Sequence, residues 1–165
     1  MLVGLMGAGK STVGRRLAKR IGWEFVDSDE AIEAAAGCSI SDIFAMHGEA
    51  IFRDLEMRVI QRLLVGPPVI LATGGGAWMQ EPVRTVIKQH GTSVWLRAEM
   101  EVLHDRVCKR GHRPLLEKGD KRAILARLVE ERYPVYALAD VTVDSGEGSH
   151  EKVVDAVLAA LEGNA

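Results

Sequence analysis

The sequence predicts a three-layer α/β/α domain built on a five-stranded parallel sheet. Short apolar runs alternate along the chain with longer segments whose apolar residues recur at helical spacing, which is typical of a parallel sheet covered by helices on both faces. The first and third apolar runs open onto glycine-rich turns, where the carboxyl ends of strands are expected to bind ligands. No repeat, low-complexity tract or linker divides the 165 residues, so we expect one domain over residues 1–165.

The individual elements follow from runs, spacings and turn residues. We expect strands at residues 2–5, 24–26, 69–72, 93–96 and 141–143. We expect helices at 10–21, 31–36, about 39–48, 49–64, 82–90, 98–107, 122–133 and 150–161. Pro82 suits the first turn of its helix, and Gly91 is the expected stop. Residues 109–120 mix charges, two glycines and Pro114 without periodicity, which predicts a loop.

Composition excludes several classes of protein. Hydrophobic residues make up 47% and charged residues 27% of the chain, as in globular domains, and no apolar run reaches the ~18 residues of a membrane span. A net charge of -2 argues against nucleic-acid binding. The first residues lack the basic and long apolar regions of a secretory signal, so we expect a cytoplasmic protein. Cys38 and Cys108 have neither zinc-site nor disulfide-scaffold spacing, and we expect reduced thiols.

The glycine-rich turn after the first strand carries a nucleotide-binding motif. Residues 4–11, GLMGAGKS, match G-x-x-x-x-G-K-[ST] between a predicted strand and a predicted helix, the context that this P-loop requires. The glycines let backbone N–H groups point inward at phosphate, and the helix presents its positive end to the same anion. Lys10 is expected to reach the β and γ phosphates, and the Ser11 hydroxyl to ligate Mg²⁺. A glycine turn without a nucleotide would explain neither side chain.

The motif alone does not say what is done with the phosphate. Kinases, GTPase switches and ATP-driven machines all use it. The guanine-reading Asn-Lys-x-Asp and the D-x-x-G element of GTPases do not occur, and the chain leaves little room for the coupling elements of a motor. A small kinase is therefore favoured.

Four further groups of residues are candidates for the expected ligand-binding edge. Asp27 and Asp29, two apart at the end of a strand, could hold Mg²⁺ and activate an acceptor hydroxyl respectively, or simply cap the next helix. Arg53 and Glu56, three apart on a helix, could be a surface ion pair. The glycines at 74–76 allow close approach of a ligand but equally suit a tight turn.

The fourth group is the basic loop. It could close over ATP and bring an arginine to the transferred phosphoryl group, or it could be an ordinary charged surface loop. Its basic residues are Arg106, Lys109, Arg110, Arg113 and Lys121.

Taken together, these residues resemble the shikimate kinase family, within the nucleoside monophosphate kinase-like P-loop fold. The resemblance runs over almost the whole chain, and the order and spacing of its elements are specific. These elements are residues 4–12, Asp27-Ser28-Asp29, Phe52-Arg53 with Glu56, Gly74-Gly75-Gly76, Arg113-Pro114-Leu115-Leu116 and Arg132-Tyr133.

The resemblance implies a role for each matching residue. ATP would be bound by Gly7, Ala8, Gly9, Lys10, Ser11, Thr12, Arg106 and Arg113, with Arg106 against adenine and Arg113 on a mobile lid at about 109–120. Shikimate would be held by Asp29, Arg53, Gly75 and Arg132, since two arginine forks suit its carboxylate. Ser11 and Asp27 would serve Mg²⁺, and Lys10, Asp29 and Arg113 would be catalytic.

The implied activity is transfer of the γ-phosphate of MgATP to the 3-hydroxyl of shikimate. The products would be shikimate 3-phosphate and ADP, in the chorismate route to aromatic amino acids, and the family favours a monomer. A kinase for another polyol acid, such as gluconate, and a non-catalytic ATP-binding sensor are the alternatives; the paired arginines disfavour the first, and retention of Asp27, Asp29 and Arg113 disfavours the second.

Overall fold

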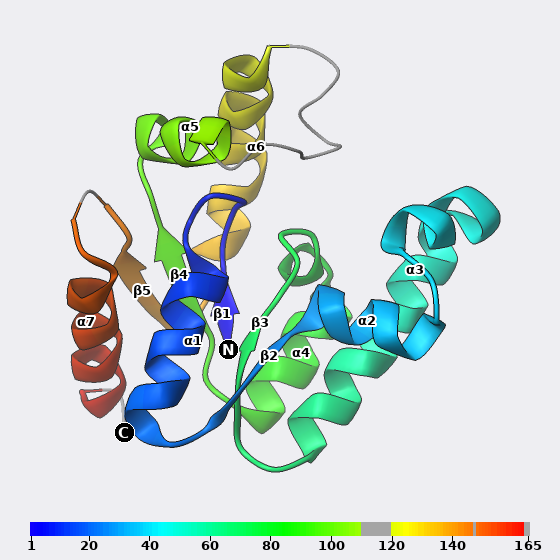
Figure 1. The fold of residues 1–165 in the computed structure, drawn as a ribbon, viewed down its shortest axis with the longest axis horizontal. Helices are drawn as coiled ribbons and strands as arrows, with labels where there is room; N and C mark the ends of the chain where they lie inside the picture. Colours follow the sequence, from blue (N-terminus) through cyan, green and yellow to red (C-terminus); the bar gives the residue numbers. More distant parts are fainter. Residues whose placement is uncertain (110–119, 147, 164–165) are drawn as a thin grey trace.

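The predicted strands form one parallel sheet in the order β2-β3-β1-β4-β5 (Figure 1). They are β1 (Leu2–Val3), β2 (Glu24–Asp27), β3 (Val69–Ala72), β4 (Val94–Arg97) and β5 (Val141–Asp144). Leu2 pairs with Ala72 on one side and with Val94 on the other, so β1 lies at the centre of the sheet. The computed structural model describes residues 1–109, 120–146 and 148–163. Within them, the predicted fold class is confirmed.

Helices cover both faces of this sheet. They are α1 (Lys10–Ile21), α2 (Ser28–Ala36), α3 (Ile40–Val65), α4 (Glu81–His90), α5 (Met100–Lys109), α6 (Lys121–Tyr136) and α7 (His150–Glu162), with a short 3₁₀ helix η1 (Ala77–Met79). α1 and α7 pack together on one face, and α3 and α4 pack together on the other (Figure 1). The arrangement places the carboxyl ends of β1, β2 and β3 side by side, each leading into a segment with predicted functional residues.

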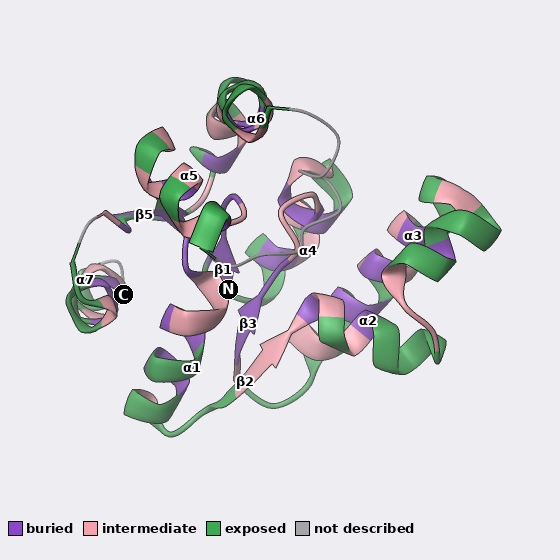
Figure 2. Ribbon diagram, turned by 45° about the horizontal axis from the view of Figure 1, so that its top comes forward, coloured by how far each residue is buried: buried purple, intermediate pink, exposed green. Residues whose placement is uncertain are grey.

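The core lies along the central strands. Figure 2 shows β1 and β3 as buried, whereas the edge strand β2 is only partly buried. Trp78, Leu5, Leu17 and Ile60 are among the fully buried side chains that pack around the sheet. Full burial of such a side chain contributes roughly 1.5–3 kcal/mol each. The residues that carry the predicted site are therefore mounted on a rigid, well-packed frame.

Some element ends differ from the sequence-based prediction. α2 begins at Ser28 rather than at Ala31, because the Asp27 side chain caps it by accepting from the Asp29 N–H. α6 continues through Pro134 to Tyr136, which is fully buried and hydrogen-bonded to the Gly75 carbonyl. The first strand ends at Val3 instead of Leu5, since Gly4 already has a loop conformation with φ of 142°.

The long helix α3 contains the predicted break. Gly48 has φ of 78° and ψ of 179°, which separates an amino-terminal part from the part that carries Arg53 and Glu56. The amino-terminal part is capped by Ser39 and Asp42, which form a capping box. None of the helices in residues 1–109, 120–146 and 148–163 is long and apolar enough to cross a membrane.

Candidate active site

The phosphate loop joins β1 to α1 and has the conformation that its glycines predict. Gly4, Gly7 and Gly9 all have positive φ, a region that other residues rarely adopt. A Cβ on Gly4 would also lie 2.8 Å from the Leu96 carbonyl oxygen of the neighbouring strand, so no larger residue fits there. Gly9 is the residue that precedes α1 and makes no side-chain cap, so the positive end of that helix adjoins the phosphate loop.

The Lys10 side chain lies over this loop. Its ammonium donates to the carbonyl oxygens of Gly4 at 2.8 Å and Leu5 at 3.0 Å. It is also close enough to Asp29 to oppose the rise in the pKa of that carboxyl. Lys10 thus lies between the phosphate loop and the predicted acceptor site.

Asp27 makes two contacts through its two oxygens. One oxygen caps α2 by accepting from the Asp29 N–H at 3.1 Å, and the other accepts from the Ser11 hydroxyl at 3.0 Å. The alternative that Asp27 only caps a helix is therefore too narrow, since it also faces the first turn of α1.

The pair of Ser11 and Asp27 fits a magnesium site. Mg²⁺ on a nucleotide usually takes only one or two protein oxygens and completes its shell with phosphate oxygens and water. A serine hydroxyl and a carboxylate beside a phosphate loop are such a donor set. Within the described part of the chain, no group of three or more His, Cys, Asp or Glu side chains is arranged to hold a metal ion.

Asp29 is the second residue of α2. Burial and the nearby charge of Asp27 raise the pKa of Asp29, and the charge of Lys10 acts in the opposite direction. A carboxylate with a raised pKa is a better proton acceptor than an ordinary aspartate. Asp29 therefore has the electrostatic setting of a general base.

The glycines at 74–76, between β3 and η1, each face a different predicted substrate-binding side chain. A Cβ on Gly74 would lie 2.7 Å from an Asp29 carboxylate oxygen. A Cβ on Gly75 would lie 3.2 Å from a terminal guanidinium nitrogen of Arg132, and one on Gly76 would lie 2.9 Å from those of Arg53. The three side chains come from α2, α6 and α3, and they converge on three consecutive glycines. A tight turn alone would not require side chains from three helices to meet there.

Arg53 is held in place by a buried carboxylate. Its guanidinium donates to Glu56 at 2.8 Å, and the Glu56 side chain is only 1% exposed. Glu56 also accepts from the side-chain amide of Gln80 at 2.8 Å. Burial raises the pKa of Glu56, and its bonds to Arg53 act against that rise. The alternative of a solvated surface pair is wrong, because one partner has no access to water.

Arg132 is placed by a neighbouring tyrosine. The hydroxyl of Tyr136, one turn further along α6, donates to the Gly75 carbonyl at 2.6 Å. Burial raises the pKa of Tyr136, whereas the charge of Arg132 and a hydrogen bond from it act in the opposite direction. Sequence reasoning missed Gln80, because no spacing relates it to Glu56. It also missed Tyr136, because the helix was expected to end at residue 133 and not to continue through Pro134.

Arg106 contacts the backbone on the outer side of the phosphate loop. It donates to the carbonyl oxygens of Gly7 at 3.3 Å, Ser145 at 3.0 Å and Gly146 at 2.6 Å. The structure thus brings Arg106 to the phosphate loop, a contact that the sequence analysis did not predict, and its role toward adenine stays a prediction. Arg113 and its neighbours Arg110 and Pro114 lie outside the described residues, as does most of the expected lid.

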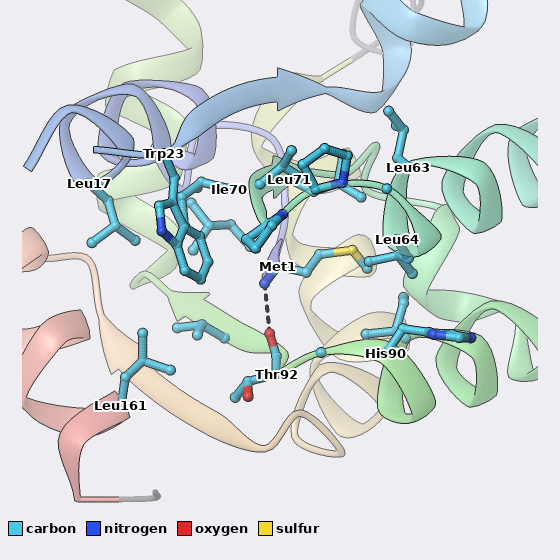
Figure 3. A pocket seen from close by; sticks show the side chains of 18 residues that line it. Met1, Leu17, Trp23, Leu63, Leu64, Ile70, Leu71, His90, Thr92 and Leu161 are labelled. Atoms are coloured by element: carbon cyan, nitrogen blue, oxygen red, sulfur yellow. Dashed lines mark hydrogen bonds between the residues drawn. The ribbon is translucent and has the colours of Figure 1, made fainter. Parts of the chain in front are cut away.

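A separate apolar cavity of about 390 Å³ lies at the opposite end of the sheet (Figure 3). Trp23, Leu64, His90 and Leu161 are among its lining residues, and the Met1 amino group beside it donates to the Thr92 carbonyl at 2.6 Å. None of the predicted site residues lines this cavity. It lies at the amino ends of the strands, whereas ligands of such sheets bind at the carboxyl ends.

A phosphate loop beside a cluster of two arginines and a carboxylate defines a small-molecule kinase of the P-loop class. The family model for shikimate kinase matches residues 6–162. The chain belongs to the shikimate kinase family.

Individual relatives agree with this assignment. A shikimate kinase of Paramagnetospirillum magneticum is 59% identical over 161 residues, which cover 98% of this chain and 83% of that protein. The structure of a shikimate kinase from Acinetobacter baumannii in complex with shikimate is 39% identical, with a TM-score of 0.91 over 99% of this chain and 92% of that one. A gluconokinase from Sinorhizobium meliloti, at 22% identity and a TM-score of 0.62 over 98% of this chain and 90% of that one, shares the fold.

Proposed function

We propose that this protein transfers the γ-phosphoryl group of ATP to the 3-hydroxyl of shikimate, giving shikimate 3-phosphate and ADP. This reaction is a step in the chorismate route to aromatic amino acids. The convergence of Asp29, Arg53 and Arg132 on the glycines at 74–76, beside the phosphate loop, carries the proposal. Membership of the shikimate kinase family supports it independently.

The nucleotide is held by the phosphate loop. Backbone N–H groups from Gly7 to Thr12 surround the phosphates, and the Lys10 ammonium leaves the Gly4 and Leu5 carbonyls to contact them. Arg106 flanks this site, and we assign it to the adenine side. Arg113 is proposed to reach the phosphates from the lid.

Shikimate is a carboxylate with several hydroxyls, and the side chains that converge on the glycines at 74–76 offer partners for both. Arg53 and Arg132 bind the carboxylate through their planar forks, while Gly75 lets the ring approach the backbone. Asp29 accepts the proton of the attacking hydroxyl, a role that its raised pKa favours. The transfer is then catalysed chiefly by positioning and by neutralising charge on the phosphoryl oxygens.

Magnesium is held by Ser11 and Asp27 in this proposal. When bound, it neutralises phosphate charge and helps to align the phosphoryl group for transfer. Ser11 contributes a hydroxyl at the first turn of α1, and Asp27 contributes the carboxylate oxygen that does not cap α2. We further propose a single kinase domain that acts as a monomer in the cytoplasm, with a lid at about 109–120.

An ADP-release assay with a panel of acceptors tests the function directly. Shikimate should support turnover, and gluconate and nucleoside monophosphates should not. Turnover with gluconate in place of shikimate would support the polyol-acid alternative. Tight ATP binding without turnover on any acceptor would support the sensor alternative.

The carboxylate site is tested by Arg53→Ala. This change should raise KM for shikimate by at least tenfold, because a charge-assisted bidentate contact is lost, and should leave KM for ATP unchanged. Arg58→Ala is the matched control, since Arg58 lies on the same helix with an exposed side chain paired to Asp54. Wild-type shikimate affinity in Arg53→Ala would contradict the assignment.

A further inference from the structure

Two side chains from outside the phosphate loop hydrogen-bond to its carbonyl oxygens. The carbonyl oxygen of Ala8 accepts from the hydroxyl of Ser145 at 2.7 Å, although the two residues are 137 positions apart. The carbonyl of Gly7 accepts from Arg106, which also donates to the Ser145 hydroxyl at 3.2 Å. Ser145 and Arg106 therefore form one hydrogen-bonded unit behind two consecutive residues of the loop.

Ser145 is itself rigidly placed. It is fully buried, and it follows β5 directly. Its N–H donates to the Arg97 carbonyl at the end of β4, at 2.6 Å, so the sheet ladder sets its position. Its hydroxyl both donates to Ala8 and accepts from Arg106, which leaves little freedom to rotate.

The direction of the loop carbonyls matters for anion binding. A loop that points its N–H groups inward must point its carbonyl groups outward, and a buried carbonyl without a donor is costly. Ser145 supplies that donor to Ala8, and Ala8 is itself buried. A donor that is fixed before the nucleotide arrives lowers the cost of ordering the loop on binding.

We propose that Ser145 is a positioning residue for the ATP phosphates, acting through the Ala8 carbonyl and not by contact with the nucleotide. This inference rests on the proposed function only in that the loop binds nucleotide phosphates. Arg106 has a second role beside any contact with adenine, since it bonds both the loop and Ser145.

The test compares phosphate binding with nucleoside binding in Ser145→Ala. Loss of one hydrogen bond behind the loop should weaken binding of MgADP and of inorganic tripolyphosphate by a similar factor, about fivefold to tenfold, measured by calorimetry. KM for ATP should rise by the same factor, while KM and Kd for shikimate stay at the parent values. Weaker MgADP binding with unchanged tripolyphosphate binding would place the effect at adenine and overturn the proposal.

Ser93→Ala separates positioning from stability. Ser93 is also a fully buried serine next to a strand, and its hydroxyl donates to Asp140 at 2.6 Å, away from the loop. We expect Ser93→Ala to lower Tm while leaving MgADP and tripolyphosphate binding unchanged. Equal losses of binding in the two variants would mean that Ser145 acts through general stability, which overturns the proposal.

A second variant and the nucleotide binding of the parent protein serve as further controls. If Ser145→Ala does not fold, Ser145→Cys carries the same comparison, because a thiol fills the site but donates only weakly. A parent protein that binds no nucleotide would contradict the proposed function. A parent that binds MgADP, with a Ser145→Ala variant that binds it equally well, would contradict only the role of Ser145.

Discussion

At the scale of single residues, the half-buried carboxylate of Asp29 and the buried carboxylate of Glu56 have different surroundings. Asp29 lies near a second carboxylate, Asp27, and its pKa is raised first by burial and then by that charge. Burial raises the pKa of Glu56 as well, but Glu56 accepts hydrogen bonds from Arg53 and Gln80. The first setting suits a group that takes a proton, and the second suits a group that fixes an arginine.

Asp29→Asn should remove activity without harming the fold. The folded state binds the Asp29 proton more tightly than the unfolded state does, so charged Asp29 lowers stability at neutral pH. That cost disappears as the pH falls through the raised pKa. We expect Tm at pH 7 to equal or exceed that of the parent, with any gain shrinking toward acid pH, and kcat to fall by about 10²-fold or more.

The control for this change is Asp54→Asn on α3. Asp54 is an exposed carboxylate paired with Arg58, and its loss should leave kcat unchanged and change Tm little. If Asp29→Asn kept a tenth or more of the parent kcat, the general-base role would be wrong.

Glu56→Gln tests whether the buried carboxylate orients Arg53. The amide keeps an acceptor but loses the charge, so the guanidinium is held less firmly. KM for shikimate should rise by about fivefold to tenfold, with KM for ATP unchanged, in steady-state assays. Glu49→Gln is the matched control, because Glu49 also accepts from Arg53 but is 68% exposed. An equal effect of both changes would show that burial of Glu56 is irrelevant.

At the scale of elements, side chains from three helices converge on the segment between β3 and η1. Gly74 donates its N–H to the fully buried Ser28 hydroxyl at 3.1 Å, and the Gly75 carbonyl accepts from Tyr136. The segment is thus tied to α2 and α6 at once. Small residues are required there because functional side chains occupy the space where a Cβ would lie.

Gly76→Ala should alter binding more than stability. The backbone of Gly76, with φ of -90° and ψ of -19°, suits alanine, but the new methyl group would lie 2.9 Å from the Arg53 guanidinium. That long side chain can move aside, so we expect Tm to change little and KM for shikimate to rise at least fivefold. Gly91→Ala, whose Cβ would meet nothing within 4 Å, should change neither quantity. An unchanged KM in Gly76→Ala would argue against Arg53 as a ligand.

At the scale of the whole molecule, close packing of α1 on the sheet sets the position of the phosphate loop relative to Asp27 and Asp29. Gly14, inside α1, lies directly over the Phe25 ring of β2 and beside Leu2 of β1. This contact fixes the distance between the helix that follows the phosphate loop and the strand that leads to Asp27 and Asp29.

Gly14→Ala should destabilise the protein even though alanine favours helices. A Cβ there would lie 2.5 Å from a ring carbon of Phe25, and the resulting overpacking costs roughly 1–3 kcal/mol. Urea unfolding of the variant measures this loss. In a Phe25→Ala background the same change should cost far less, because the ring is gone. Equal costs in both backgrounds would contradict the packing explanation.

The sequence alone was sufficient to predict features that depend on residues close together along the chain. The strand, loop and helix around Lys10 follow from local spacing, and so do the break at Gly48 and the helix stop at Gly91. The P-loop could be located because its glycines, lysine and serine act within one turn of chain. The candidate shikimate residues came from resemblance to a family, since spacing left Arg53 and Glu56 open to a surface pairing.

Only the tertiary structure decided which distant residues meet. The sheet order places α3 and α6 so that Arg53 and Arg132 reach adjacent glycines, and it places Ser145 behind Ala8. It also determined that Glu56 is buried while Glu49 on the same helix is exposed. The physical reason is that periodicity reports which face of an element is apolar, whereas contacts between elements depend on how the strands are ordered and how the helices pack on them.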